Sequence, residues 1–96
     1  MDRQERQRFE TLRDAALELH GRLQTSILAV RNVGALSDAM GVQTLQSQYR
    51  LNLSMLCEQY LGLKQLQSSY PNDAELANAV ITCEAYFGDL NVQPPL

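Results

Sequence analysis

The most informative run of the chain is FETLRDAALELHGRLQTSILAV, residues 9–30. Its apolar side chains recur at steps of three and four: Phe9, Leu12, Ala16, Leu19, Leu23, Ile27 and Val30. This period places them on one stripe of an α-helix, because a strand would alternate every second residue. Asp2 and Glu5 have the spacing of a capping box, and Gly34 is a typical C-terminal stop. We therefore predict a first helix of about 30 residues, roughly 45 Å long at the usual rise.

A second run with the same period follows a short connector at residues 35–41. Its apolar and aromatic positions are Val42, Leu45, Tyr49, Leu53, Leu56, Tyr60, Leu63 and Leu66. Pro71 should end this helix, because the residue before a proline is pushed out of helical geometry. Two long helices joined by a short connector usually pack antiparallel, so the first two helices are predicted to form a helical hairpin.

The third run is shorter and begins at Asn72, which has capping-box spacing to Glu75. Its apolar positions are Leu76, Val80, Cys83, Phe87 and Leu90. Gly88 is expected to end this helix. Residues 80–83 would also suit a short strand, which the sequence leaves as an alternative.

The three runs define one domain. Residues 1–90 are predicted to form a single helical domain, and residues 91–96, with Pro94 and Pro95, a loose C-terminal tail. The predicted fold class is all-α: an antiparallel helical hairpin of two long helices plus a shorter third helix, completed by a second copy into a dimeric helical bundle.

The composition is that of a globular protein, with 45% hydrophobic residues in 96. No apolar run approaches the roughly 20 residues that cross a bilayer, and the densely charged first six residues do not resemble a secretory signal, so a cytoplasmic location is expected. Cys57 and Cys83 lie far apart and are expected to be reduced, small hydrophobic side chains. The formal net charge of -3 argues against a nucleic-acid partner, because such binding sets Lys and Arg against phosphate.

The third helix is too short to cover the whole hairpin. It should leave one side bare on seven residues near the connector: Leu19, Leu23, Ile27, Val30, Val42, Leu45 and Tyr49. Within residues 19–49 the only charged side chains are Arg22, Arg31 and Asp38, whereas the first eighteen residues carry nine. Interface cores are similarly poor in charge, so we predict a protein interface here, most simply a two-fold homodimer of two hairpin ends. The alternative is a monomer whose third helix covers everything.

No residue pattern in the sequence carries catalytic chemistry. The only histidine, His20, has no sequence neighbour that could orient it as a base or share a metal ion. Phosphate-cradling glycine loops, nucleophile elbows and paired-histidine zinc motifs are missing. We therefore expect no catalytic, cofactor-binding or metal-binding residues. The expected function is a non-catalytic protein-binding regulator or chaperone of the anti-activator, inhibitor or adaptor type.

A different function is suggested by residues 35–42, ALSDAMGV. They resemble the first helix and turn of a helix-turn-helix DNA-binding domain, in which a small residue, a turn glycine and a following valine are usual. The resemblance implies a small transcriptional regulator that uses the connector and the second helix. Ser47 and Arg50 depart from the pattern, because that family uses apolar residues there to seat its recognition helix.

Overall fold

The computed structural model describes residues 1–33 and 39–95, with all their side chains except those of Val30, Asn32, Val33 and residues 39–42. Within these ranges the chain forms three α-helices and no strand: α1 (Arg3–Val33), α2 (Ala39–Ser69) and α3 (Ala74–Asp89). The all-α prediction is therefore confirmed for the described residues.

Helix α3 resolves the alternative that the sequence left open. Residues 80–83, which also suited a strand, lie inside this helix. The predicted helix stop at Gly34 lies outside the described residues.

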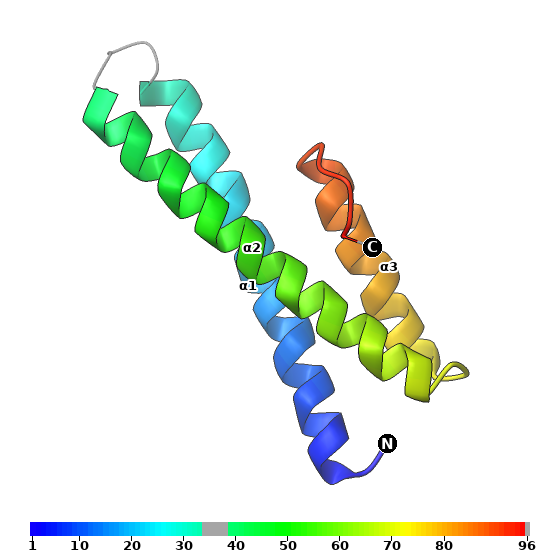
Figure 1. The fold of residues 1–96 in the computed structure, drawn as a ribbon. Helices are drawn as coiled ribbons and strands as arrows, with labels where there is room; N and C mark the ends of the chain where they lie inside the picture. Colours follow the sequence, from blue (N-terminus) through cyan, green and yellow to red (C-terminus); the bar gives the residue numbers. More distant parts are fainter. Residues whose placement is uncertain (34–38, 96) are drawn as a thin grey trace.

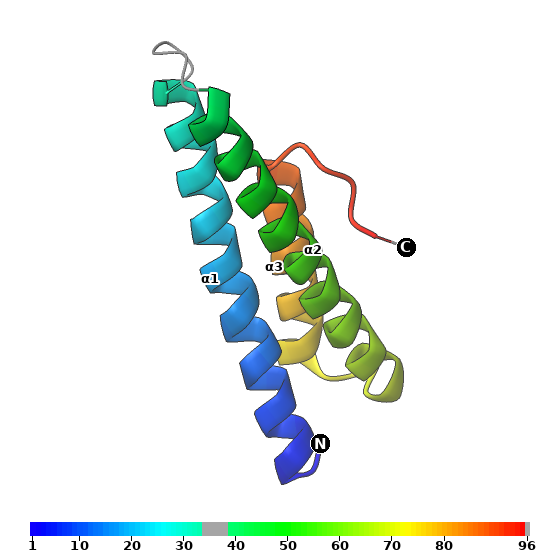
Figure 2. The same ribbon diagram turned by 60° about the vertical axis from the view of Figure 1, so that its left-hand side comes forward.

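Helices α1 and α2 lie side by side and run in opposite directions, and α3 turns back along them (Figures 1 and 2). Arg8 Nη2 donates to Gln65 Oε1 at 3.2 Å. One turn further along, Leu12 faces Gly62, where an added Cβ would come within 3.0 Å of Leu12 Cδ1. The missing side chain at Gly62 thus allows a close approach of the two helices. The molecule is elongated, with extents of 51 × 22 × 18 Å.

The first helix starts at the capping box that the sequence predicts. The Glu5 amide donates to Asp2 Oδ1 at 2.8 Å, and the Asp2 amide reaches Glu5 Oε1 at 3.5 Å. For α3 the predicted cap is wrong by one residue. Asp73, not Asn72, accepts the Leu76 amide at 3.0 Å, because its extended backbone aims the carboxylate at the first turn.

The end of α3 also differs from the prediction. The helix continues through Gly88, and the left-handed residue that terminates it is Asn91, with φ of 56°. The Val92 amide donates to Phe87 O at 3.0 Å and the Asn91 amide to Gly88 O at 3.1 Å, which together form a Schellman motif. Asparagine tolerates this conformation better than most residues, so no glycine is needed there. Val92 also packs against the core, so this part of the predicted loose tail is anchored.

The core lies where all three helices meet. Its buried members are Phe9, Ala16, Leu19, Leu23, Leu56, Tyr60, Leu63, Leu66, Leu76, Ala79, Val80, Cys83, Phe87 and Leu90. The prediction that Leu19 and Leu23 have one side uncovered is wrong, since their exposed fractions are 3% and 0%. The physical reason is that α3 reaches further than expected, because Asp89 in its last turn lies beside His20. None of the three helices, as described, has the length and apolar content of a bilayer-spanning segment.

Candidate interaction surface

A step in the molecule arises because the helices differ in length. Helix α3 has 16 residues, whereas α1 and α2 have 31 each. At the usual rise α3 spans roughly 24 Å of the ~46 Å length of its neighbours. Figure 1 shows the α1–α2 pair continuing well beyond the C-terminal end of α3. One side of this far end therefore has no third helix on it.

Two hollows occupy this side, and we give the name shelf to a set of the α1 and α2 residues that line them. It is defined by six residues: Ile27, Leu28, Arg31, Gln46, Tyr49 and Arg50. One hollow, of about 460 Å³, lies between α1 and α2. The other, of about 480 Å³, lies between α1 and the end of α3. Ile27 and Arg31 line both hollows, so the surface is continuous from Tyr49 to the last turn of α3.

The shelf is apolar at its centre. Ile27 and Tyr49 are half-buried and pack against the edge of the core. Leu28, the next residue on α1, is 58% exposed. Leu45, one turn of α2 before Tyr49, is half-buried as well. These side chains offer apolar area that the monomer leaves in contact with water.

The structure divides the seven residues predicted at the interface into three groups. Leu19 and Leu23 belong to the core. Ile27, Leu45 and Tyr49 are half-buried at the far end of the α1–α2 pair. Val30 and Val42 lie outside the described side chains.

Sequence reasoning missed Leu28, Arg31 and Arg50. Leu28 and Arg50 stand one position beside apolar-stripe members, so a search for regular spacing passes over them. The two arginines could have been found from the local charge pattern. Residues 19–57 contain three arginines and one aspartate, whereas the rest of the chain contains five basic and ten acidic residues.

The six shelf residues thus include two arginines and no acidic residue, although Asp89 of α3 lines the second hollow. Arg31 and Arg50 are exposed, and no carboxylate among the described residues lies within ion-pair distance of either. At the opposite end of the molecule Arg6 is held by Glu75 at 2.8 Å and by Glu10 at 3.2 Å. The two shelf guanidinium groups can thus still accept an anionic partner.

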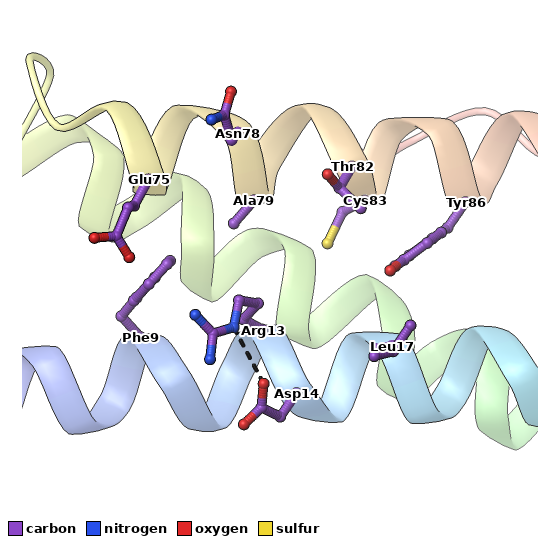
Figure 3. Close-up of a pocket in the computed structure, with 10 residues that line it drawn as sticks. All are labelled: Phe9, Arg13, Asp14, Leu17, Glu75, Asn78, Ala79, Thr82, Cys83 and Tyr86. Carbon is purple, nitrogen blue, oxygen red and sulfur yellow. Dashed lines mark hydrogen bonds and ion pairs between the residues drawn. The ribbon is translucent and has the colours of Figure 1, made fainter.

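A separate groove, of about 320 Å³, lies between α1 and α3, away from the shelf (Figure 3). Its floor includes Phe9, Ala79 and Cys83. On its rim Arg13 pairs with Asp14 at 3.1 Å and lies over the Phe9 ring, 5.3 Å from the ring centre. Burial raises the pKa of the Cys83 thiol to about 11, so this sulfur stays protonated and is a poor nucleophile.

His20 has a partner that the sequence does not reveal. Its ring stacks on Tyr86, and its Nε2 atom lies 3.2 Å from Asp89 Oδ2. Among the described residues, no hydroxyl or thiol is hydrogen-bonded to the ring. These contacts of His20 with Tyr86 and Asp89 join α1 to α3. Among the described residues, no group of three or more His, Cys, Asp or Glu side chains could hold a metal ion.

The helix-turn-helix resemblance requires a turn at Gly41. In the structure Gly41 lies inside α2, which runs without interruption from Ala39 to Ser69. Residues 35–38 of the resemblance lie outside the described residues. The expected turn is therefore absent at Gly41, and no separate recognition helix begins after it.

Comparison with known proteins adds no relative to this picture. No family model, no curated protein and no solved structure matches the chain.

Proposed function

We propose that this chain is a non-catalytic protein-binding domain that buries the shelf against a helix of another polypeptide. Small adaptors, inhibitors, anti-activators and chaperones work in this way, by accepting an amphipathic helix in an apolar groove. The observation that carries the proposal is the step at the end of α3, which leaves Ile27 and Tyr49 half-buried beside the exposed Leu28. Contiguous apolar surface of this kind on a small domain usually marks an interaction site.

The chemistry of the shelf indicates what such a helix should carry. Its centre accepts an apolar side chain, since burial contributes about 25 cal/mol for each Å² of apolar area removed from water. Arg31 and Arg50 flank that centre and have no described carboxylate partner. A complementary helix therefore combines an apolar anchor with acidic residues about one turn away. A homodimer is the simplest assembly that supplies such a helix.

The cytoplasm is the compartment that we propose for this activity. Cys57 and Cys83 are both free thiols. Burial raises the pKa of each, which keeps the thiols protonated. Reduced cysteines of this kind are typical of cytoplasmic proteins.

The proposal is tested by photo-cross-linking from the shelf. A benzophenone amino acid replaces Leu28, and in a matched control it replaces Leu51, which is 63% exposed against 58% for Leu28. Leu51 lies two residues from Tyr49, so it points to a different side of α2. Each protein is produced in the cell that makes it, irradiated, and resolved by denaturing electrophoresis.

Position 28 should give a discrete polypeptide adduct that disappears when Ile27→Asp is added. Position 51 should give none. Equal adducts from both positions, or none from position 28, would contradict the proposed role of the shelf.

A further inference from the structure

We infer that the helix that occupies the shelf is α3 of a second copy of this chain, in a two-fold dimer whose α1–α2 pairs run antiparallel. The inference rests on the proposed function and specifies its partner. Each copy would supply the third helix that the other copy lacks at its far end. The dimer would then have two equivalent contacts between a shelf and an α3 helix, as two-fold symmetry requires.

The helix lengths fit this arrangement. Two α3 helices of 16 residues together have about the length of one α1 helix of 31 residues, so they can cover it from both ends with their last turns side by side. In the antiparallel pairing each α3 covers the base of its own α1–α2 pair and the far end of the partner's pair. The step in each monomer is thereby filled without any rearrangement of the chain.

Two contacts set the level of α3 along α1. Arg6 bonds Glu75 at 2.8 Å, so these two residues lie at the same height along α1 and α3. His20 lies 3.2 Å from Asp89, so these two share a second, higher level. When two α1 helices run in opposite directions and overlap along their whole length, the height of Arg6 in one copy matches that of Val30 in the other. Glu75 of one copy therefore lies level with the neighbourhood of Arg31 in its partner.

The same register brings the exposed face of α3 to the centre of the shelf. Ile81 stands six residues after Glu75, which places it level with Gln24 of the second copy. The contact of Leu12 with Gly62 sets the height of α2, and by that measure Gln24 is level with Arg50 and next to Tyr49. Ile81 thus reaches the aromatic side of the shelf.

Ile81 has the properties of an anchor. It is 62% exposed in the monomer, on the side of α3 that faces away from the buried residues Ala79 and Cys83. Ala77 and Ala85 lie one turn before and after it on the same face. These short side chains would let the backbone of α3 come close to the shelf around Ile81.

The charges are complementary as well. Helix α3 contains Glu75, Glu84 and Asp89 and no basic residue. Glu75 gives one oxygen to Arg6, and Glu84 gives one oxygen to the Tyr60 hydroxyl, so each carboxylate keeps a second oxygen for an arginine. In the register above, Glu75 meets Arg31 and Glu84 lies within one turn of Arg50.

This dimer differs from the one that the sequence predicts, in which two hairpin ends combine. That arrangement would bring Arg31 and Arg50 of both copies together, and residues 19–57 offer only Asp38 against them, since Arg22 is already paired with Glu18. Like charges brought together at an interface oppose association. Placing the acidic α3 on the cationic shelf removes this conflict.

Charge reversal on each side tests the inference. The shelf variant carries Arg31→Glu and Arg50→Glu, and the helix variant carries Glu75→Lys and Glu84→Lys. Solution mass is measured by light scattering across a concentration series, and circular dichroism verifies that each variant is helical. The wild type should have twice the 10.8 kDa chain mass. Each variant alone should be monomeric, and an equimolar mixture should regain the dimer, because the mixture pairs opposite charges at both contacts.

A second pair of variants guards against a folding defect in the first. Ile81→Asp should raise the dimer dissociation constant by about tenfold or more, as expected for loss of an interface anchor. Leu51→Asp, a matched change at an exposed leucine, should leave the constant unchanged.

A wild-type monomer, or a dimer insensitive to Ile81→Asp and to both charge reversals, would overturn the inference. If position 28 then still gives an adduct with a different polypeptide, the proposed function stands and only its partner is wrong. If position 28 gives no adduct, both proposals fail.

Discussion

The ring of His20 on α1 stacks on the ring of Tyr86 on α3, with centroids 4.1 Å apart and an interplanar angle of 16°. The same imidazole reaches Asp89 in the last turn of α3. These contacts hold α3 parallel to α1 where the core ends and the shelf begins. Residues far apart in the sequence therefore determine how much of the α1–α2 pair stays uncovered.

Replacing His20 should loosen this end of α3. His20→Ala removes the stacking and the contact with Asp89, and we expect the free energy of unfolding to fall by about 1 kcal/mol. Urea denaturation followed by circular dichroism measures the loss. Tyr86→Phe is the control, because it keeps the stacked ring, and it should change stability by much less. Equal losses in the two variants would show that the stacked rings are not what holds α3 here.

Tyr60 should make the protein less stable in strong alkali. Burial, together with the hydrogen bond to Glu84 at 2.9 Å, raises the pKa of Tyr60 from 10.0 to about 12. The folded state therefore keeps a proton that the unfolded state releases near pH 10. The stability from this difference is complete below pH 10 and is lost as the pH rises to about 12.

Absorbance of tyrosinate during an alkaline titration checks this expectation. The Tyr60→Phe variant should lack one of the groups that ionise near pH 12 in the wild type. The hydroxyl of Tyr70 bonds Glu5, and its pKa is raised to about 12 as well. The Tyr70→Phe variant is therefore the matched comparison, and it should also lose one group near pH 12 while it keeps that of Tyr60. An unchanged absorbance curve above pH 11 in Tyr60→Phe would refute the assignment.

Leu23 and Leu45 should respond differently to substitution, although the sequence pattern places both at the predicted interface. Leu23 is fully buried, so Leu23→Ala should cost about 2–5 kcal/mol of stability even in the monomer. Leu45 is only half-buried, so Leu45→Asp should weaken association while helicity is largely kept. Thermal denaturation and light scattering of the two variants separate the effects. Unfolding by Leu45→Asp would place Leu45 in the monomer core.

The start of α3 depends on Asp73. Asp73→Ala removes the cap on the Leu76 amide and should lower stability by about 1 kcal/mol. Asn72→Ala tests the neighbouring residue that the sequence pattern favours, and it should be nearly neutral. Chemical denaturation of both variants compares them directly. The reverse order would restore Asn72 as the cap.

The sequence by itself determined the helices and most of the core. Apolar residues spaced three and four apart, such as Phe9, Ala16 and Leu63, form one apolar stripe on any helix that carries them, because this period is a local property of the backbone. The capping box of Asp2 and Glu5 is equally local, since both residues lie within one turn. At the ends of α3 the predicted capping residues were wrong by one to three positions. Asparagine, aspartate and glycine are all common at helix ends, so the sequence alone does not show which of them caps the helix.

Only the tertiary structure decided how far α3 reaches. Its length was apparent in the sequence, but its height along α1 depends on the contacts of Glu75 with Arg6 and of Asp89 with His20. Those pairs are 69 residues apart in the chain, and no local spacing encodes them. This height puts Leu19 and Leu23 in the core and leaves Ile27 and Tyr49 at its edge. The extent of the shelf is therefore a result of packing between distant segments.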